Sequence, residues 1–392
     1  MRTFHLSLCF MFGRFPFACT LAALSFTVLG RAEFSFTTRN FRPGGGELRG
    51  MVGANNRLVA VGNFGRTLTS TDGQTWIAAT PVTTDNLNGI AFGSGTYVAV
   101  GDSGRVVVSA DGERWSTSAV SDGLRLNAVT HGNGVFVAVG DAGRIFTSED
   151  GRVWVRRAVE LVNPSPLRGI GFEPAVGFVA GGDFISGARS NDAFNWVRGL
   201  PVSRAFTGSF QAAVGNRALG QVAALTDDGS LHRATSFDVM SAAGEFQPAF
   251  FYTESVAPRP GARFRGLIAG GRGLLAVGDG GLICSIAEFL TQPWPVVSSG
   301  TTSDLLAGTF HNGTFYVVGG NEVILQSAPP GGRPTDEHLH AWLRGRAGAP
   351  HGFGARRIGD CSETSPPPSS RTVIGRLGCN HLSLRTTANH RV

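Results

Sequence analysis

The sequence predicts an all-β protein, a seven-bladed β-propeller built from four-stranded antiparallel blades. Three close copies of one segment begin at Leu48, Leu87 and Leu126, with a spacing of 39 residues each time. A fixed period of about 40 residues is typical of propellers and solenoids. Each copy contains short runs rich in Val, Ile, Phe and Thr between Gly, Asp and Asn clusters, which indicates strands. No run has a helical period long enough for a crossover helix, so each copy is predicted to be an antiparallel meander of four strands.

Four more divergent copies bring the count to seven. The fourth begins at Leu167, a degenerate fifth covers about 209–238, and the sixth and seventh begin at Phe264 and Leu305. The seventh copy has three strand segments and no tryptophan strand. The segment FSFTTRNF (34–41) lies just before the first copy, where a preceding copy would carry its outermost strand. We therefore expect this N-terminal strand to complete the seventh blade and close the ring, which removes exposed sheet edges.

The first 32 residues have the composition of a secretory signal peptide. Arg2 and Arg14 form a positive region, residues 15–29 are apolar but short for a bilayer span, and Gly30-Arg31-Ala32 offers small residues for cleavage after Ala32. Met11 would serve equally as the start, and a retained membrane anchor is the alternative. No other long apolar run exists, so we expect no stable membrane span after cleavage. The expected location is secreted, periplasmic or at the cell surface of a bacterium.

Composition agrees with an exported propeller over residues 33–328. Glycine supplies 56 of the 392 residues, as turns at every strand end require. Outside the signal segment only Cys284, Cys361 and Cys379 remain, and a core of this size does not need disulfides. We expect a monomer.

The repeat stops near residue 329, and residues 329–392 are rich in Gly, Pro, Arg, Ser and His. They contain nine arginines and four acidic residues, so a net +5 of the chain's formal +6 belongs to them. This predicts a disordered basic tail and argues against nucleic-acid binding by the propeller; a shifted reading frame is the alternative origin of the segment. We predict no metal and no cofactor. Five His and Cys residues of the tail could ligate zinc, but their spacing matches no usual zinc site. The group comprises His338, His340, Cys361, Cys379 and His381.

Four copies carry a Ser-x-Asp-Gly-x-x-Trp motif between their third and fourth predicted strands, with Ala193 replacing the glycine in the fourth copy. An aspartate in a tight turn accepts backbone N–H bonds, a serine hydroxyl adds another, and the tryptophan can pack between neighbouring blades. We interpret the motif as structural. Its residues are Ser70, Asp72, Trp76, Ser109, Asp111, Trp115, Ser148, Asp150, Trp154, Ser190, Asp192 and Trp196.

These repeats resemble the Asp-box (BNR) repeats of sialidase-like propellers, in a variant one residue shorter between Asp and Gly. They also resemble the repeats of the photosystem II assembly and stability factor family. The likeness covers about 48–200 well and 264–327 weakly. The second family implies a non-catalytic binding or assembly scaffold for a protein or glycan partner, which is our leading hypothesis. The first implies a glycoside hydrolase acting on extracellular glycans, which is the alternative.

Propellers commonly bind ligands on the face where the turns between second and third strands meet the blade-to-blade connections. We expect polar turn residues to ring one mouth of the channel there, where they could hold a cation or sugar hydroxyls. Asp and Asn are also common simply because they make turns. The candidate binding residues are Asn63, Asp102, Asp141, Asp183, Asp227 and Asp279, with Arg66, Arg105 and Arg144 following in three copies.

The asymmetric part of the repeat array is 198–263, which is longer than a standard blade. Its FFYTES run (250–255), with three arginines nearby, is the candidate for a functional loop, although long loops are also simply tolerated. The three arginines are Arg259, Arg263 and Arg265.

The resemblance to sialidases implies three arginines on a substrate carboxylate, a tyrosine nucleophile backed by a glutamate, and an aspartic acid. Tyr97 and Tyr316 fall in the repeated second strand, so we expect them in the core. Tyr252 and Glu254 are then the catalytic candidates. No phosphate-cradling loop, dinucleotide fingerprint or HExxH motif occurs, so a non-enzyme is favoured.

Overall fold

A computed structural model describes residues 35–120, 122–159, 161, 165–183, 187–198, 209–216, 220–227, 229–235, 237–240, 246–249, 263–270, 273–286 and 294–328. The chain divides into two compact units, Met1–Arg333 and Pro334–Val392, and every described residue belongs to the first. The predicted signal peptide and the predicted basic tail lie outside the described residues. Within the described part, no helix is long and apolar enough to cross a membrane.

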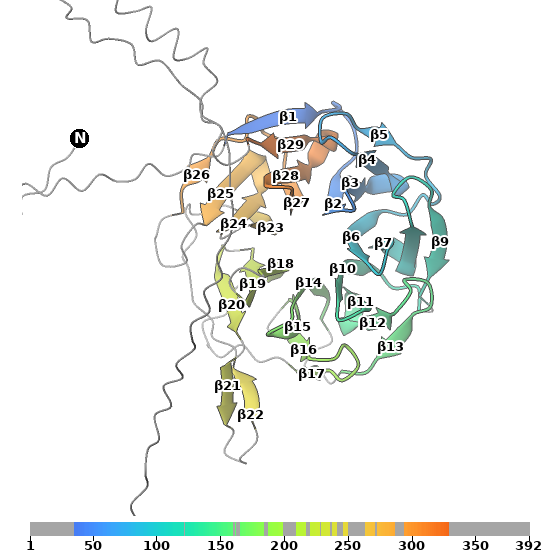
Figure 1. Cartoon of the computed structure of the whole chain (residues 1–392), viewed down its shortest axis with the longest axis vertical. Helices are drawn as coiled ribbons and strands as arrows, with labels where there is room; N and C mark the ends of the chain where they lie inside the picture. Colours follow the sequence, from blue (N-terminus) through green and yellow to red (C-terminus); the bar gives the residue numbers. More distant parts are fainter. Residues whose placement is uncertain are drawn as a thin grey trace, which may run out of the picture. The chain divides into compact units, whose positions relative to one another are not determined.

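Seven antiparallel sheets surround a common axis, which confirms the predicted propeller (Figure 1). Blade 1 contains β2 (Leu48–Ala54), β3 (Arg57–Gly62), β4 (Thr67–Ser70) and β5 (Ile77–Ala78). Blade 2 contains β6 (Leu87–Gly93), β7 (Thr96–Gly101), β8 (Arg105–Ser109) and β9 (Ser116–Ala119). Blade 3 contains β10 (Leu126–Gly132), β11 (Val135–Gly140), β12 (Ile145–Ser148) and β13 (Val155–Arg157). Blade 4 contains β14 (Leu167–Glu173), β15 (Gly177–Gly182), β16 (Gly187–Ser190) and β17 (Val197–Arg198).

The remaining blades include the closure of the ring. Blade 6 contains β23 (Phe264–Gly270), β24 (Gly273–Gly278), β25 (Leu282–Ile286) and β26 (Val296–Val297). Blade 7 contains β27 (Leu305–His311), β28 (Thr314–Gly319) and β29 (Ile324–Ser327), with β1 (Phe36–Asn40) as its outermost strand. β1 runs antiparallel to β29, with Phe36 opposite Ser327 and Asn40 opposite Ile324. The predicted closure by the N-terminal strand is confirmed.

Blade 5 differs from the expected four-stranded pattern. Its sheet has three strands among the described residues, β18 (Phe210–Asn216), β19 (Gln221–Thr226) and β20 (Leu231–Thr235). The next two strands, β21 (Phe237–Met240) and β22 (Phe246–Ala249), pair with each other in a separate hairpin. The segment that would supply a fourth strand thus satisfies its backbone hydrogen bonds locally.

The core lies between neighbouring blades. All six residues of β11 are buried, because its two faces pack against different blades. One face joins Phe136 and Ala138 to Val98 of blade 2. The other joins Val137 and Val139 to residues of blade 4. The second strands therefore consist of continuous apolar runs, and Tyr97 and Tyr316, buried in β7 and β28, belong to this core as expected.

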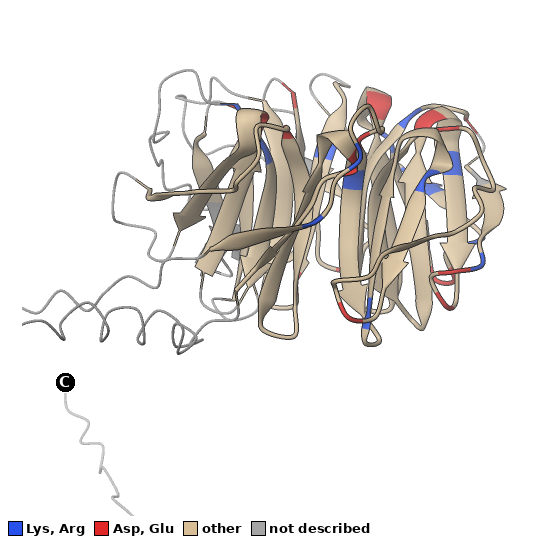
Figure 2. Ribbon diagram, turned by 90° about the horizontal axis from the view of Figure 1, so that it is seen from above, with Lys and Arg blue, Asp and Glu red and all other residues tan. Residues whose placement is uncertain are grey.

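The turns after the second strands pack onto the blade-to-blade connections. In all seven blades the first turn residue donates its backbone N–H to the carbonyl of the residue before the innermost strand, as Asp102 does to Asn86 at 3.0 Å. Gly101, just before this turn, needs to be glycine, because a Cβ there would lie 1.9 Å from the Asn86 carbonyl oxygen. These turns and connections form one face of the ring, which we call the turn face. In the side view, acidic and basic residues concentrate in the loops at the two ends of the strands (Figure 2).

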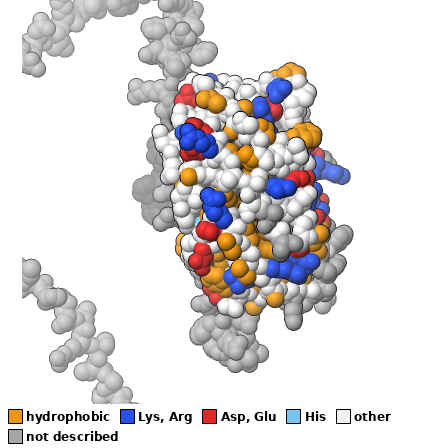
Figure 3. Space-filling view, turned by 90° about the vertical axis from the view of Figure 1, so that its right-hand side faces the viewer, with side chains coloured by type: hydrophobic (Ala, Val, Ile, Leu, Met, Phe, Trp, Pro, Cys, Tyr) orange, Lys and Arg blue, Asp and Glu red, His pale blue; other side chains and the backbone are white. Residues whose placement is uncertain are grey.

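One side of the outer wall has a mixed surface. In the space-filling view of the side where β9 and β13 lie, charged side chains are interspersed with hydrophobic ones (Figure 3).

Candidate functional site

The second residue of every innermost strand forms a β-bulge at the turn face. In blade 2 the ladder runs from Leu87–Gly101 directly to Gly89–Val100, which leaves Asn88 without a partner in the ladder. The other six innermost strands show the same shift after their first residue. A bulge redirects a side chain, and bulges are over-represented next to functional sites. The seven bulged residues are Arg49, Asn88, Asn127, Arg168, Gln211, Arg265 and Leu306.

Four of the bulged side chains bind the turn carboxylate of their own blade. The Asn88 amide donates to Asp102 at 2.9 Å, and the Asn127 amide donates to Asp141 at 3.1 Å. Two arginines do so with two hydrogen bonds each. Arg168 lies 2.6 and 2.7 Å from the two oxygens of Asp183, and Arg265 lies 2.7 and 3.2 Å from those of Asp279.

These contacts change the chemistry expected of the turn acids. The hydrogen bond from Arg168 holds the pKa of Asp183 below its usual value. The same bond raises the pKa of Arg168, and the charge of Asp183 adds to the effect. A carboxylate with a guanidinium partner has fewer lone pairs to offer a cation or a sugar hydroxyl. The turn acids of blades 2, 3, 4 and 6 are therefore partnered and do not form a free acidic ring.

The other predicted turn positions are different again. Asp227 in blade 5 accepts a hydrogen bond from the backbone N–H of Ser209 at 2.8 Å. In blade 1 the Asn63 side-chain oxygen is buried. Blade 7 has Gly320 at this position and Leu306 at its bulge. The bulged residues and the first residues of the turns together form what we call the inner rim of the turn face. This rim is asymmetric around the ring.

The three predicted binding arginines that follow the turns lie beside acidic residues. Arg105 Nε lies 2.8 Å from Asp85, in the connection between blades 1 and 2. Arg144 Nε lies 2.8 Å from Asp122, in the connection between blades 2 and 3. The hydrogen bond from Arg105 lowers the pKa of Asp85. These two arginines hold the connections against the turns.

Arg66, the third predicted binding arginine, lies at the junction of blades 7 and 1. It lies 3.0 Å from Glu322, whose side chain is only 7% exposed, and Arg42 lies 3.6 Å from the same carboxylate. This group joins the closing blade to the first one.

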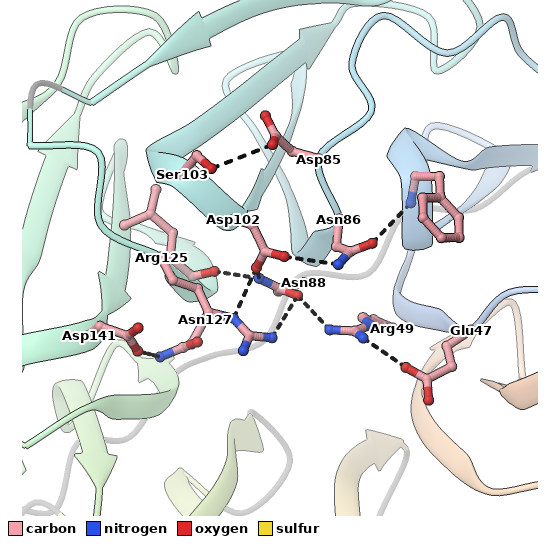
Figure 4. Close-up of polar contacts among 12 residues, drawn as sticks. Glu47, Arg49, Asp85, Asn86, Asn88, Asp102, Ser103, Arg125, Asn127 and Asp141 are labelled. Carbon is pink, nitrogen blue, oxygen red and sulfur yellow. Dashed lines mark hydrogen bonds and ion pairs between the residues drawn. The ribbon is translucent and has the colours of Figure 1, made fainter.

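A continuous polar network crosses the inner rim between blades 1 and 2 (Figure 4). Arg49 Nη1 and Arg125 Nη2 approach Asn88 Oδ1 from either side, at 3.0 and 3.2 Å. Arg49 also lies 2.9 Å from Glu47, and Arg125 lies 3.0 Å from Asp102. Two guanidinium groups therefore converge on one neutral amide oxygen at a partly exposed site.

Sequence reasoning missed Arg125 and the bulged residues other than Arg265, although it selected the turn acids beside them. A signal was present in the sequence. Six of the seven residues that follow the first apolar residue of the innermost strand are Arg, Asn or Gln, inside otherwise apolar or small segments. A polar residue at a fixed position of a buried strand indicates either a partner or an exposed bulge.

The Ser-Asp motif closes the turns at the opposite ends of the third strands. In blade 2, Asp111 Oδ1 accepts the N–H groups of Glu113 and Arg114 at 2.9 and 2.8 Å. Ser109 Oγ accepts the N–H of Gly112 at 2.8 Å. Blades 1 and 3 repeat this arrangement, and blade 4 keeps the aspartate contacts with Ala193 in left-handed backbone at φ 70°. These hydrogen bonds satisfy backbone donors within each turn.

The catalytic candidates Tyr252 and Glu254 lie outside the described residues, as does Arg259. The Tyr97 hydroxyl is committed to the Ala54 carbonyl at 2.8 Å, and burial raises the pKa of Tyr97. In the described part of the chain, no group of His, Cys, Asp and Glu is placed to hold a metal ion.

A cavity of about 870 Å³ lies where blades 6 and 7 meet. It is lined by Arg263 and Asp279 on the blade 6 side, by Phe41 after β1, and by backbone and small side chains of residues 296–302. Of the arginines predicted near the long insertion, Arg263 thus lines this cavity and Arg265 occupies a bulge.

Comparison with known proteins places the fold among the propellers. No protein-family profile and no curated protein matches the chain. YCF48 from Cyanidioschyzon merolae is 15% identical with a TM-score of 0.58, over 76% of this chain and 99% of that one. YCF48 bound to D1 peptide is 16% identical with a TM-score of 0.56, over 76% and 96%. A catalytically inactive virginiamycin B lyase from Staphylococcus aureus with quinupristin is 13% identical with a TM-score of 0.63, over 76% and 99%.

At these identities the likeness shows the fold alone, and this fold supports both binding and catalysis. The propeller fold expected from the repeats is therefore shared with these solved structures.

Proposed function

We propose that the protein is a non-catalytic scaffold that binds a segment of another protein on the turn face, at the inner rim of blades 1 and 2. One observation carries the proposal. Arg49 and Arg125 converge on the neutral Asn88 Oδ1, at 3.0 and 3.2 Å. Guanidinium groups bind carboxylates with shorter and stronger hydrogen bonds than they form with neutral acceptors. A carboxylate of a bound segment would therefore gain more from these two groups than the amide does.

The rest of the rim lacks this feature. Arg49 and Arg125 also lie beside carboxylates, Glu47 and Asp102, but each has a further nitrogen on the neutral Asn88 oxygen. Arg168 and Arg265 instead direct two hydrogen bonds each to a carboxylate of their own blade, so they have less to offer a ligand. The proposed site therefore lies at one place on the ring and does not repeat around it.

The partner class follows from the same chemistry. Planar guanidinium groups fit carboxylates, which proteins carry on acidic side chains and at the chain end. YCF48 provides an example of a propeller with a peptide bound. The signal-like composition of residues 1–32 supports a site of action in the cell envelope or outside the cell. A glycan partner would need to supply a carboxylate sugar to use the same groups.

Affinity capture tests the proposal. The full-length tagged protein, purified from the envelope fraction of its own source, should retain a protein that the double variant Arg49→Ala/Arg125→Ala loses. Arg57→Ala is the control, because Arg57 pairs with Glu113 in the loops at the opposite end of the strands. Quantitative mass spectrometry of the three samples measures the difference. A partner retained equally by all three would place binding elsewhere, and turnover of a sialoside reporter without any partner would favour a hydrolase.

A further inference from the structure

Phe64 combines two unfavourable properties. It is the middle residue of the turn Asn63–Gly65, where its backbone is left-handed at φ 56° and ψ 37°. This conformation is unfavourable for any residue with a Cβ and is an outlier for a bulky side chain. The residue as a whole is 71% exposed, the highest value among the exposed large hydrophobic residues of the described chain. The aromatic ring therefore contributes little to the core and sits on a strained backbone.

Four of the other blades show that the turn does not need this ring. Ser103, Ala142 and Asn321 occupy the same position with φ between 53° and 56°, and blade 6 has Gly280 at φ 65°. All four are small or polar, whereas the sequence of blade 4 has Phe184 here, outside the described residues. The backbone is the same in the four described turns, so its geometry gives no reason for phenylalanine in blade 1.

Phe64 is fixed to the network that contains the two converging guanidinium groups. Its backbone N–H donates to Asn86 Oδ1 at 3.0 Å. The Asn86 amide donates to Asp102 at 2.9 Å, and Asp102 lies 3.0 Å from Arg125 (Figure 4). An exposed aromatic ring is thus held on the same face as the proposed carboxylate site, by contacts that fix the turn carrying it.

We propose that Phe64 is the apolar anchor of that site. It packs against a large apolar side chain of an extended peptide whose nearby carboxylate lies between Arg49 and Arg125. This inference rests on the proposed function and adds the second determinant of the partner. Aromatic residues and arginine dominate the energetics of protein interfaces, and an aromatic ring loses little conformational entropy on binding. The bound segment is therefore a peptide with an apolar residue close to an acidic residue or to its own C-terminus.

Selection from a phage-displayed library of random 12-residue peptides tests the proposal with the full-length chain as bait. The expected peptides carry a large apolar residue close to a carboxylate. Their affinity for Phe64→Ser should be weaker by about tenfold or more, which is the scale of a central interface residue. Serine is the residue that blade 2 has at this turn. Ile77→Ser is the matched control, because Ile77 is 65% exposed on the outer strand β5 and its loss should leave the affinity unchanged.

Two failures are distinguishable. Peptides that bind the wild type and Phe64→Ser equally, or selected peptides without an apolar residue, would overturn the role of Phe64 and leave the scaffold function standing. Enrichment of no peptide by the wild type would overturn both.

A measurement without any ligand separates binding from folding. Phe64→Gly should raise the midpoint of thermal unfolding, since glycine adopts the left-handed conformation without strain and no core packing is lost. A lowered midpoint would mean that the ring supports the fold, and the anchor role would then be wrong.

Discussion

Single carboxylate oxygens hold the turns between the third and fourth strands. In blade 3, Asp150 Oδ1 accepts the N–H groups of Arg152 and Val153 at 2.8 and 2.9 Å and the Ser148 hydroxyl at 3.0 Å. Three donors favour the ionised form, so the pKa of Asp150 is lowered, with the Val153 contact as the main cause. The motif that resembles an Asp box thus has a physical role within each blade, whatever the whole protein binds.

This role predicts a pH-dependent effect at Asp72. The N–H groups of Thr75 and Gln74 lower the pKa of Asp72 from 3.8 to about 2. A carboxyl group whose folded pKa is depressed stabilises the fold above its unfolded pKa, and this contribution is lost as the pH falls through the folded pKa. The difference in unfolding midpoint between wild type and Asp72→Asn should be present at neutral pH and should shrink between about pH 4 and pH 2. A difference that stayed constant down to pH 2 would mean that the charge is not responsible.

Trp115 predicts a larger effect that does not depend on pH. It is 8% exposed and packs with Val59 and Val61 of blade 1, while its ring N–H donates to the Gly112 carbonyl at 3.3 Å. Trp115→Ala should destabilise the protein by about 3–5 kcal/mol in chemical denaturation, because a cavity opens between two blades. The neighbouring Ser116→Ala serves as control. An unchanged midpoint for Trp115→Ala would contradict packing between the blades.

At the scale of the element, each blade depends on a close approach between a turn and the connection before it. A Cβ at Gly101 would lie 1.9 Å from a backbone oxygen, whereas a Cβ at Gly89, in the innermost strand of the same blade, would meet its nearest atom at 3.2 Å. Blade 3 has Ala128 where blade 2 has Gly89. The two glycines therefore meet different constraints within one blade.

Gly101→Ala should therefore destabilise the protein by about 1–3 kcal/mol or more, as overpacking against an immovable backbone does. Gly89→Ala is the matched control and should cost clearly less. Urea denaturation of both variants measures the difference. Equal costs would show that the turn can move away from the connection without loss.

The elements also mark the limit of what the sequence could predict. Short runs of β-branched and aromatic residues between turn residues located the strands of blades 1 to 4, and the repeat of about 40 residues predicted four strands in each. The bulge after the first residue of each innermost strand is indicated in the sequence only by a recurring polar residue, and what that side chain contacts depends on how the strand meets the turn in space. For the same reason the pairing of Asp183 with Arg168 was missed, although both residues were visible. In blade 5 the period indicated a fourth strand, but local hairpin pairing of β21 with β22 competed with it.

The whole ring is closed by its two ends. β1 supplies the outer strand of blade 7, and Glu322 binds Arg66 and Arg42 across the junction with blade 1. The closing contacts are thus both backbone hydrogen bonds and a buried carboxylate that holds two arginines. Loss of β1 would expose the edge of β29 as an unpaired strand.

Deletion of residues 1–41 should therefore lower the unfolding midpoint and produce concentration-dependent association through the exposed β29 edge. Size-exclusion chromatography and thermal unfolding measure the two effects. Deletion of residues 1–33 is the control, since it leaves β1 intact. A shortened chain that stayed monodisperse with an unchanged midpoint would contradict closure by β1.

The bulge at the turn-face end of every innermost strand has a consequence for the evolution of the protein. Read around the ring, the bulged positions carry Arg, Asn, Asn, Arg, Gln, Arg and Leu. Each stands outside its strand ladder, so replacing one leaves the backbone pairing of that ladder in place. Asn88 and Asn127 also donate to the first carbonyl of the next blade, so the most replaceable positions are those without such a bridge. A new partner requires new side chains at a few of these positions and no new fold.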